Sequence, residues 1–437
     1  MIISIIIPTR ERADYLKESI QTVLQIPDPN IEIIINDNAN TDGTKQVISE
    51  ISDPRIKHID TGRRVSMREN FEFGLRNSTG DYVTFLGDDD GILPRQFKFL
   101  RHILEKERPD TLGWNVPSTF IWPEEKHDKK SGSVIFNKEK SFGGIHRFNG
   151  EKYGKHLLAC HLSRIRFPPG IYAAGCASRG YLKRIAAPDG TYFNSIIPDA
   201  YFWFRALLEG GNFLHVDHPF AISGQSPTSG GKTYHALPDK SDDSKTMPYH
   251  RFMAESQLDN VTDVVPHTLS NTLIPFATLE TIRARFPRED QVPDYLAWYN
   301  YVLSEDSSWR STVEKILREY AVSSGTLSEF EQAEAEQASK RTRKTEKCCA
   351  TSQKALSELK EVLRNYATRS PIFPVPKKFR LSAEIARKNT ILTAVNVYDS
   401  VLADDYEHIL NRTVSRKAIW KRAVKRSRAY RIWQANT

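Results

Sequence analysis

The chain has 437 residues, of which 39% are hydrophobic and 27% charged, a composition typical of a globular protein of about two or three domains. Its four cysteines follow no spaced framework, and no stretch approaches the roughly 18 continuous apolar residues of a membrane span, so disulfide-rich and membrane-spanning classes are excluded. The formal net charge of +8 comes from the tail, since residues 411–437 carry nine Lys or Arg and no acidic residue. With no secretory leader at the N-terminus, the expected location is the cytoplasm.

The first ~100 residues alternate short apolar runs with stretches of helical periodicity, the pattern of βαβ units on a parallel sheet. Strands are predicted at 2–7, 31–35, 56–59 and 82–86, with helices between them at 15–24, 44–51 and 67–75. Parallel sheets bind ligands beyond the C-terminal ends of their strands. The residues that follow the first, second and fourth strands are therefore candidates for a binding site.

The remainder of the chain predicts a mixed region, a linker and a helical region. From 111 to about 224, aromatic strand-like pieces accompany one helix at 200–209. Residues 226–250 are rich in Ser, Gly, Thr, Lys, Asp and Pro, a composition typical of a flexible loop or linker. The predicted organisation is a sheet domain at 1–225, this linker, and a mainly helical C-terminal region at 251–437.

The strongest signal for chemistry is the triplet Asp88-Asp89-Asp90, which follows the predicted strand at 82–86 and one glycine. Carboxylates two residues apart on a turn, a DxD pattern, can both face a hard divalent cation. Mg²⁺ or Mn²⁺ held in this way stabilises the charge that grows on a departing diphosphate. The alternative is an acidic turn that caps the following helix.

A second signal is Asp37, which follows the strand at 31–35 and precedes the turn at 38–44. A carboxylate at this strand end can accept a hydrogen bond from a nucleotide base or a ribose. The alternative is an ordinary turn residue, which is the more frequent role of a single aspartate at such a place.

Three segments together resemble the family 2 glycosyltransferases of the GT-A fold. The matching sequences are SIIIPTRER at 4–12, EIIINDNANTDGT at 32–44 and GDYVTFLGDDD at 80–90. They stand in the order of the family, each at a predicted strand, and cover roughly the first half of the chain. The resemblance implies an α/β fold with a Rossmann-like, mostly parallel sheet that binds a nucleotide-diphospho-sugar, followed by a helical C-terminal extension.

The resemblance also implies roles for individual residues. The donor nucleotide would be bound by Pro8, Thr9, Glu11, Asp37, Asn38, Arg68, Asn70, Asp88 and Asp89. Asp37 would bind the base; because the family often has a second aspartate in place of Asn38, the choice of uracil or another base stays open. Asp90, assisted by Asp88, would hold Mn²⁺ or Mg²⁺. The alternative for Arg68 and Asn70 is that they belong to the basic, solvent-facing side of a helix, which would show the same residues.

A later segment, 197–205, looks like the Glu-Asp motif of the family, in which an acidic residue opens a helix with aromatic residues and an arginine. Pro198 replaces the usual glutamate, and Asp199 keeps its place. In inverting members this aspartate is the general base that removes the proton of the acceptor hydroxyl. The alternative is an N-terminal helix cap. Trp203 and Arg205 are candidates for acceptor binding, although an aromatic helix of this kind also fits the core.

The tail at 414–433 has partial helical amphipathicity. One half carries Ile419, Trp420, Ala423 and Val424, and the other carries Lys417, Lys421, Lys425 and Arg428. This pattern predicts either peripheral contact with an anionic membrane surface or a helix docked on the protein, with a solvated basic terminus as a further alternative. No nucleic-acid-binding module is present, so no nucleic acid partner is expected.

The sequence therefore predicts a cytoplasmic, inverting, metal-dependent glycosyltransferase acting in surface polysaccharide biosynthesis; membrane contact of the tail, where it occurs, would place it at the inner face of the cell membrane. It would move a sugar from a nucleotide diphosphate, UDP being the expected one, to a hydroxyl of a saccharide or lipid-linked saccharide. A sugar nucleotidyltransferase is disfavoured, because the loop at 8–12 contains no glycine. A non-catalytic scaffold that binds nucleotide sugar or membrane is disfavoured by the intact Asp37, Asp90 and Asp199.

Overall fold

A computed structural model describes residues 1–116, 119–123, 131–228, 254–257, 259, 264–266, 270–304, 309–347 and 377–431. Most of the predicted linker at 226–250 and the last residues of the tail lie outside these ranges. Within them, every helix is too short or too polar to traverse a lipid bilayer.

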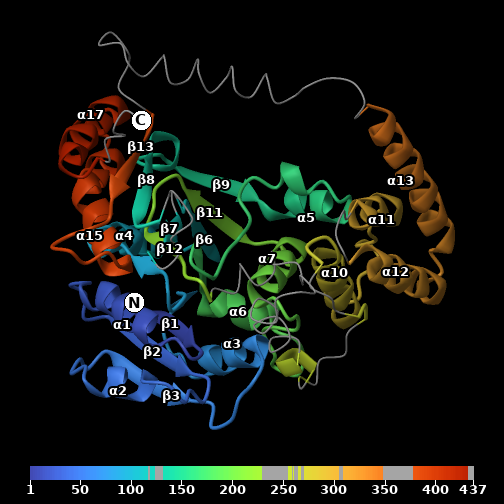
Figure 1. Cartoon of the computed structure of the whole chain (residues 1–437), viewed down its shortest axis with the longest axis horizontal. Helices are drawn as coiled ribbons and strands as arrows, with labels where there is room; N and C mark the ends of the chain where they lie inside the picture. The colour runs from blue at the N-terminus through green and yellow to red at the C-terminus, as the bar shows by residue number, and fades with distance from the viewer. Residues whose placement is uncertain are drawn as a thin grey trace.

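An eight-stranded sheet forms the centre of the N-terminal half (Figure 1). Across the sheet, the strands are β3 (Ile56–Asp60), β2 (Ile31–Asp37), β1 (Ile3–Thr9), β4 (Tyr82–Phe85), β10 (Gly175–Ser178), β6 (Thr111–Trp114), β11 (Asn212–Val216) and β9 (Ile145–Asn149). The first four are parallel to one another, and β11 is parallel to β6, whereas β10 and β9 run antiparallel to their neighbours. The predicted α/β fold with a mostly parallel sheet is confirmed.

Strand β1 shows why this sheet forms at the centre of the domain. Ile5 and Ile7 pack on one face and Ile6 on the other, and all three are fully buried. A strand that is apolar on both faces needs helices on both sides, as parallel sheets generally have. The register pairs Thr9 with Asp37, so the C-terminal ends of β1 and β2 lie level.

Helices cover both faces of the sheet. On the face of Ile5 lie α1 (Ala13–Leu24) and α4 (Phe97–Glu107), with α2 (Thr44–Ser49) beside α1. On the face of Ile6 lie α3 (Met67–Arg76), α5 (Gly150–Leu158), α6 (Arg179–Ile185) and α7 (Pro198–Glu209). The helices predicted at 15–24, 44–51, 67–75 and 200–209 are therefore confirmed within a few residues.

Two small sheets extend this body. One has the order β5 (Gly91–Ile92), β12 (Ala221–Gln225), β7 (Thr119–Ile121). The other joins β8 (Ser133–Asn137) to β13 (Lys378–Ser382), which comes from the far end of the chain. The region predicted as mainly helical thus also contributes a strand.

The C-terminal region forms two separate groups of helices. The first, α10 (Leu273–Arg285), α11 (Tyr295–Leu303), α12 (Arg310–Ser324) and α13 (Leu327–Lys347), packs against α7 (Figure 1). The second, α15 (Ile391–Leu402), α16 (Tyr406–Leu410) and α17 (Arg416–Arg426), shares one hydrophobic core with β1 and α1. The domain division at 225 and 250 stays a prediction, but residues 378–430 share the core of the N-terminal half.

Helix α17 is the described part of the predicted amphipathic tail. Ile419 and Trp420 are almost fully buried, and the Trp420 ring stacks on Phe136 of β8 at a centroid distance of 5.3 Å. Of the alternatives predicted for the tail, the structure therefore shows a docked helix. Its exposed side carries Lys417, Lys421, Lys425 and, just beyond it, Arg428.

Candidate active site

Polar residues gather beyond the C-terminal ends of β1, β2 and β4. A hydrogen bond links the end of β1 to the segment after β4: Thr9 Oγ1 donates to Asp88 Oδ2 at 3.0 Å. Because Thr9 also pairs with Asp37 in the sheet register, all three predicted segments meet at one edge. This is the edge at which parallel α/β sheets bind their ligands.

The three consecutive aspartates are all buried and each has different partners. Asp88 pairs with Arg12 Nη1 at 2.8 Å, and Asp89 pairs with Arg12 Nη2 at 2.5 Å. Asp89 also accepts hydrogen bonds from Ser226, from the backbone N–H at 3.1 Å and from Oγ at 2.8 Å. Asp90 instead accepts from the backbone N–H groups of Gly87 at 3.0 Å and Gly224 at 2.7 Å. Among the ion pairs of the described residues, none includes Asp90.

These contacts leave an excess of negative charge at Asp90. Burial, followed by the neighbouring Asp89, raises the pKa of Asp90 to about 7, although the two backbone N–H groups oppose the shift. Burial also raises the pKa of Asp88 to about 6, even with Arg12 beside it. Three buried carboxylates share one guanidinium, so a cation bound here would stabilise their charged forms.

The aspartates fit a divalent cation that takes most of its ligands from a substrate. No group of three or more His, Cys, Asp or Glu in the described part of the chain is arranged as a complete metal site. Mg²⁺ and Mn²⁺ often need only one or two protein carboxylates, the other positions being filled by water and phosphate oxygens. Each Asp90 oxygen accepts one hydrogen bond, which leaves further lone pairs for a metal.

Asp37 and Asn38 form part of the wall of the site. Asp37 is fully buried; its Oδ2 lies 3.1 Å from His58 Nε2, and its Oδ1 accepts from the Asn40 backbone N–H at 2.8 Å. Both ends of the Asn38 amide bond the backbone of Val65, at 2.9 Å each. Contact between Asp37 and a base therefore requires movement of the surrounding side chains. His58 was missed by the sequence analysis, although alternation along the third strand turns its side chain toward the same face as Asp37.

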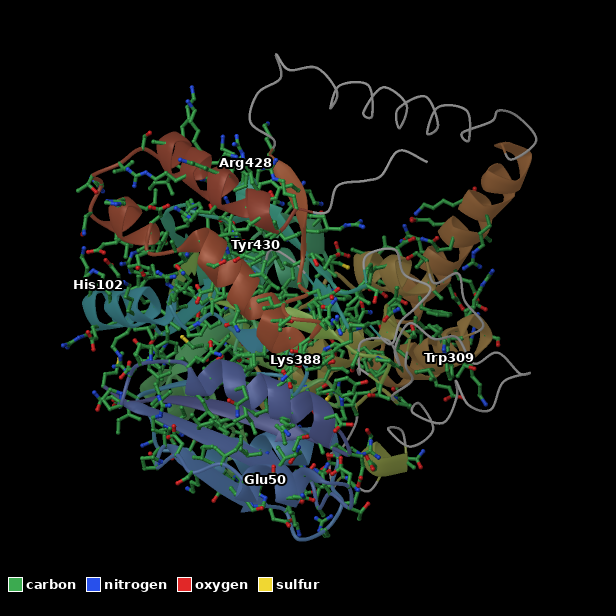
Figure 2. All side chains as sticks on the ribbon, turned by 60° about the vertical axis from the view of Figure 1, so that its left-hand side comes forward. Glu50, His102, Trp309, Lys388, Arg428 and Tyr430 are labelled. Atoms are coloured by element: carbon green, nitrogen blue, oxygen red, sulfur yellow. The ribbon has the colours of Figure 1, made fainter. Side chains whose placement is uncertain are left out.

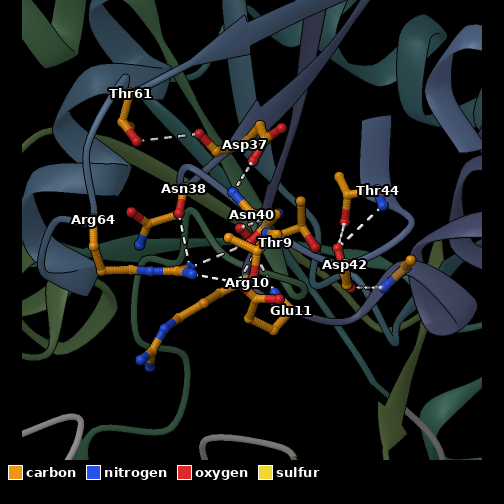
Figure 3. A network of polar contacts seen from close by, with 12 residues as sticks. Thr9, Arg10, Glu11, Asp37, Asn38, Asn40, Asp42, Thr44, Thr61 and Arg64 are labelled. Atoms are coloured by element: carbon orange, nitrogen blue, oxygen red, sulfur yellow. Dashed lines mark hydrogen bonds and ion pairs between the residues drawn. The ribbon is translucent and has the colours of Figure 1, made fainter. Parts of the chain in front are cut away.

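The loop after β1 is held by a polar network (Figure 3). Glu11 adopts a left-handed φ of +52°, and its carboxylate accepts bonds from Arg64 and from the Thr41 backbone N–H and hydroxyl, the last two at 3.0 and 3.1 Å. Burial alone would raise the Glu11 pKa, but the bonds from Arg64 and Thr41 outweigh it and lower the pKa. Glu11 thus fixes this loop. Arg64, which the sequence analysis missed, belongs to an Arg-Arg pair between β3 and α3.

Arg68 and Asn70 lie at the start of α3, whose first turn is capped by Ser66 Oγ, accepting from the Glu69 backbone N–H at 3.0 Å. Arg68 holds Asp259 with two nitrogens, the Nε contact being 2.7 Å, and Arg10 pairs with Glu255 through Nη2. Asn70 is buried, and its side-chain oxygen has no hydrogen-bond partner among the described residues. A phosphate is the same kind of partner for Arg68 as the carboxylate of Asp259.

Asp199 lies in the first turn of α7. Pro198 begins this helix, at a position where a backbone N–H would have no partner within the helix, so the N–H that proline lacks is not missed. The Asp199 side chain is exposed, although protein surrounds it closely enough for desolvation to raise its pKa; the backbone N–H groups of Ala200 and Asp199 oppose this shift. Asp199 therefore lies at the N-terminus of α7 and is also open to solvent.

The two acceptor candidates on α7 lie differently. Trp203 is half-buried and contacts Phe204, with ring centroids 4.1 Å apart. Arg205 is buried; it pairs with Glu209 at 3.0 Å, and its guanidinium lies 3.8 Å from the Phe286 ring centroid. Arg205 therefore packs α7 against the end of α10.

Tyr172 connects the aspartate triplet with Asp199, and the sequence analysis missed it. After burial, the causes that raise the Tyr172 pKa well above its usual value are the charges of Asp90, Asp89, Asp88 and Asp199, in that order. One phenol thus lies within electrostatic reach of all four carboxylates. Of the four, the charge of Asp199, which lies more than a hundred residues after the triplet, contributes least.

Comparisons with known proteins find glycosyltransferases. Residues 4–165 match the family model described as Glycosyl transferase family 2. A GalNAc(5)-diNAcBac-PP-undecaprenol beta-1,3-glucosyltransferase of Campylobacter jejuni is 33% identical over 94 residues, which are 21% of this chain and 30% of that protein. An uncharacterized glycosyltransferase of Haemophilus influenzae is 34% identical over 105 residues, 23% of this chain and 42% of that protein. The chain thus spans less than half the length of either relative.

A search of solved structures finds TarS of S. aureus, with 13% sequence identity and a TM-score of 0.41. The match covers 77% of this chain and 55% of that one.

Proposed function

We propose that the protein transfers a sugar from a nucleotide diphosphate donor to a hydroxyl of an acceptor, because residues 4–165 match the model of the family 2 glycosyltransferases. The observation that carries the proposal is the aspartate triplet at the C-terminal edge of the parallel strands, where Thr9 bonds Asp88 and Arg12 pairs with Asp88 and Asp89. A base and a cation site on opposite sides of a bound sugar would suit a single displacement. The two relatives described above are named glycosyltransferases, which supports the same reaction class.

In the proposed reaction, Asp199 is the general base. It takes the proton of the acceptor hydroxyl while the hydroxyl oxygen forms a bond to the anomeric carbon of the sugar. The bond from this carbon to the diphosphate oxygen breaks, and its electron pair leaves with the nucleotide diphosphate. Because attack comes from the face opposite the leaving group, the configuration inverts. The raised pKa of Asp199 makes its carboxylate a stronger base than an ordinary aspartate.

Asp90, with Asp88, would hold Mn²⁺ or Mg²⁺. When bound, this ion supplies positive charge to the diphosphate. The chain's own residues keep the site in shape: Arg12 bonds Asp88 and Asp89, and the backbone N–H groups of Gly87 and Gly224 orient the Asp90 carboxylate.

The donor nucleotide would lie along the ends of β1 and β2, against Pro8, Thr9 and the loop that Glu11 fixes. Asp37 and Asn38 would shape the base pocket. UDP as the nucleotide stays a prediction, since the Asp37 carboxylate is covered by His58 in this structure. The Campylobacter relative is named for a PP-undecaprenol-linked saccharide, which favours a lipid-linked saccharide as the acceptor here. Such an acceptor would suit surface polysaccharide biosynthesis.

Membrane contact would have to use the cations of α17, because the apolar side of this helix is buried in the protein. This contact stays a prediction. The cytoplasmic location also stays a prediction.

The proposed function is tested by Asp199→Asn. The amide cannot accept the proton, so turnover should fall about 10²- to 10⁴-fold while the donor dissociation constant stays the same. Asp14→Asn is the matched control, since Asp14 is an exposed residue of α1. Turnover of Asp199→Asn at the level of the native protein would refute the assignment. A protein that binds nucleotide sugars without transferring or hydrolysing them would instead be a scaffold.

A further inference from the structure

Tyr172 is held rigidly beside the aspartate triplet. Its neighbours in the chain bond the end of β4: the Phe85 backbone N–H donates to the Ile171 carbonyl at 2.7 Å, and the Ala173 N–H donates to the Phe85 carbonyl at 2.8 Å. Its ring packs near Phe71 of α3, with centroids 5.9 Å apart. Strand β4 and helix α3 together therefore determine where the hydroxyl points.

The hydroxyl of Tyr172 lies next to the Asp90 carboxylate. A Cβ atom added to Gly87 would be 2.6 Å from Tyr172 Oη and also 2.6 Å from Asp90 Oδ2. Both oxygens therefore lie on the same side of Gly87, which explains why this position between strand and aspartates carries no side chain. The residue as a whole is half-buried.

Despite these neighbours, the Tyr172 hydroxyl makes no hydrogen bond to any residue that the structure describes. Tyrosine hydroxyls surrounded by protein usually find a partner. Tyr82, at the other end of β4, shows the usual case, since its hydroxyl donates to the Pro109 carbonyl at 2.8 Å. A free donor beside a cation site suits an anionic ligand, because phosphate oxygens accept strong hydrogen bonds.

We propose that Tyr172 is a further catalytic residue, whose hydroxyl donates a hydrogen bond to a diphosphate oxygen of the departing nucleotide. This inference rests on the proposed function. The proton stays on the tyrosine throughout: Asp199 takes the acceptor proton, and the diphosphate leaves with the electron pair of the broken bond. The hydrogen bond strengthens as charge moves onto the diphosphate, so it stabilises the transition state more than the ground state.

The experiment compares Tyr172→Phe with the native protein and with Tyr82→Phe. Both substitutions remove one oxygen. Tyr172→Phe keeps the packing of the ring on Phe71 and breaks no hydrogen bond of the described residues, so its melting temperature should stay close to native. Tyr82→Phe loses the bond to the Pro109 carbonyl and should melt somewhat lower, so both variants are assayed well below their melting temperatures. From UDP, GDP, CDP and TDP, the nucleotide that binds best in the presence of Mn²⁺ serves as the probe, beside its monophosphate.

Tyr172→Phe should lower kcat about 10- to 100-fold, the range expected for a hydrogen bond to a charged group. It should weaken binding of the diphosphate and leave binding of the monophosphate unchanged, whereas Tyr82→Phe should change neither. Unchanged kcat and diphosphate affinity would overturn the inference. So would a lower kcat with an unchanged preference for diphosphate over monophosphate, which would place the hydroxyl on the sugar or the acceptor. Absence of nucleotide binding and transfer in the native protein would instead reject the proposed function.

Discussion

At the scale of single residues, burial decides how the aspartates behave. A carboxylate in water titrates near pH 4, but Asp90 is surrounded by protein and by two further carboxylates, and its pKa is about 7. Below that pH, Asp90 is protonated in the folded protein and has lost the charge with which a metal is bound. A cation and a proton therefore compete for the same group.

This competition predicts a pH dependence of metal binding. The stabilisation by Mn²⁺ plus nucleotide diphosphate should be large at pH 8 and should fall as the pH drops below about 7, with the metal affinity decreasing up to tenfold per pH unit. Thermal unfolding at pH 6 and pH 8 measures the effect. Asp90→Ala should abolish it at both values, while Asp14→Asn should behave as the native protein. Stabilisation by metal in Asp90→Ala would contradict the assignment of this carboxylate.

Sequence reasoning located residues whose role follows from their place on a strand. Asp37, Asp88 and Asp90 come directly after apolar runs, and the structure places them at one edge of the sheet. The roles of Arg12, His58 and Tyr172 were not predicted, because these roles depend on contacts with segments that are distant in the sequence. Tyr172 reaches the aspartates only through a loop that bonds the end of β4. No local pattern in its own segment indicates that contact.

At the scale of elements, the strands and helices of the N-terminal half could be predicted because their apolar patterns are strong and local. The pairing of β13 with β8 could not, since these segments are far apart in the chain and the pairing depends on tertiary contacts. The same is true of the junction between α4 and α15. There, Asp399 accepts hydrogen bonds from Gln96 Nε2 at 2.6 Å and from the Arg95 backbone N–H at 2.8 Å.

Asp399 predicts how the stability of this junction depends on pH. Burial raises its pKa to about 6, above the value near 4 of an unfolded chain. The folded state therefore holds a proton that the unfolded state releases between these values, and stability falls as the pH rises through this window, by up to about 3 kcal/mol. Urea unfolding at pH 4.5 and pH 7 should show a smaller difference for Asp399→Asn than for the native protein. An equal difference would mean that Asp399 does not contribute.

At the scale of the whole molecule, the two ends of the described chain stabilise each other. Helix α15 packs on α1, where the Thr390 hydroxyl donates to Glu18 at 2.7 Å, and α17 lies over β8 and β13. Figure 2 labels Lys388, just before α15, and Arg428 and Tyr430, just after α17; of the three, Lys388 lies nearest to the N-terminal helix in this view. The strands that carry the aspartates therefore belong to a core that residues 391–424 complete.

Trp420→Ala tests this dependence. Removing a buried tryptophan leaves a cavity beside Phe136, and the free energy of unfolding should fall by about 3–5 kcal/mol. Lys421→Ala is the control, because Lys421 is exposed on the same helix and its loss should change stability by less than about 0.5 kcal/mol. If the C-terminal helices complete the core of the catalytic half, Trp420→Ala should unfold in a single transition, at a lower denaturant concentration than the native protein. Nucleotide binding and the helical signal should disappear together in that transition. Loss of the helical signal at a concentration where nucleotide still binds would show that α17 unfolds on its own and that the N-terminal half does not need it.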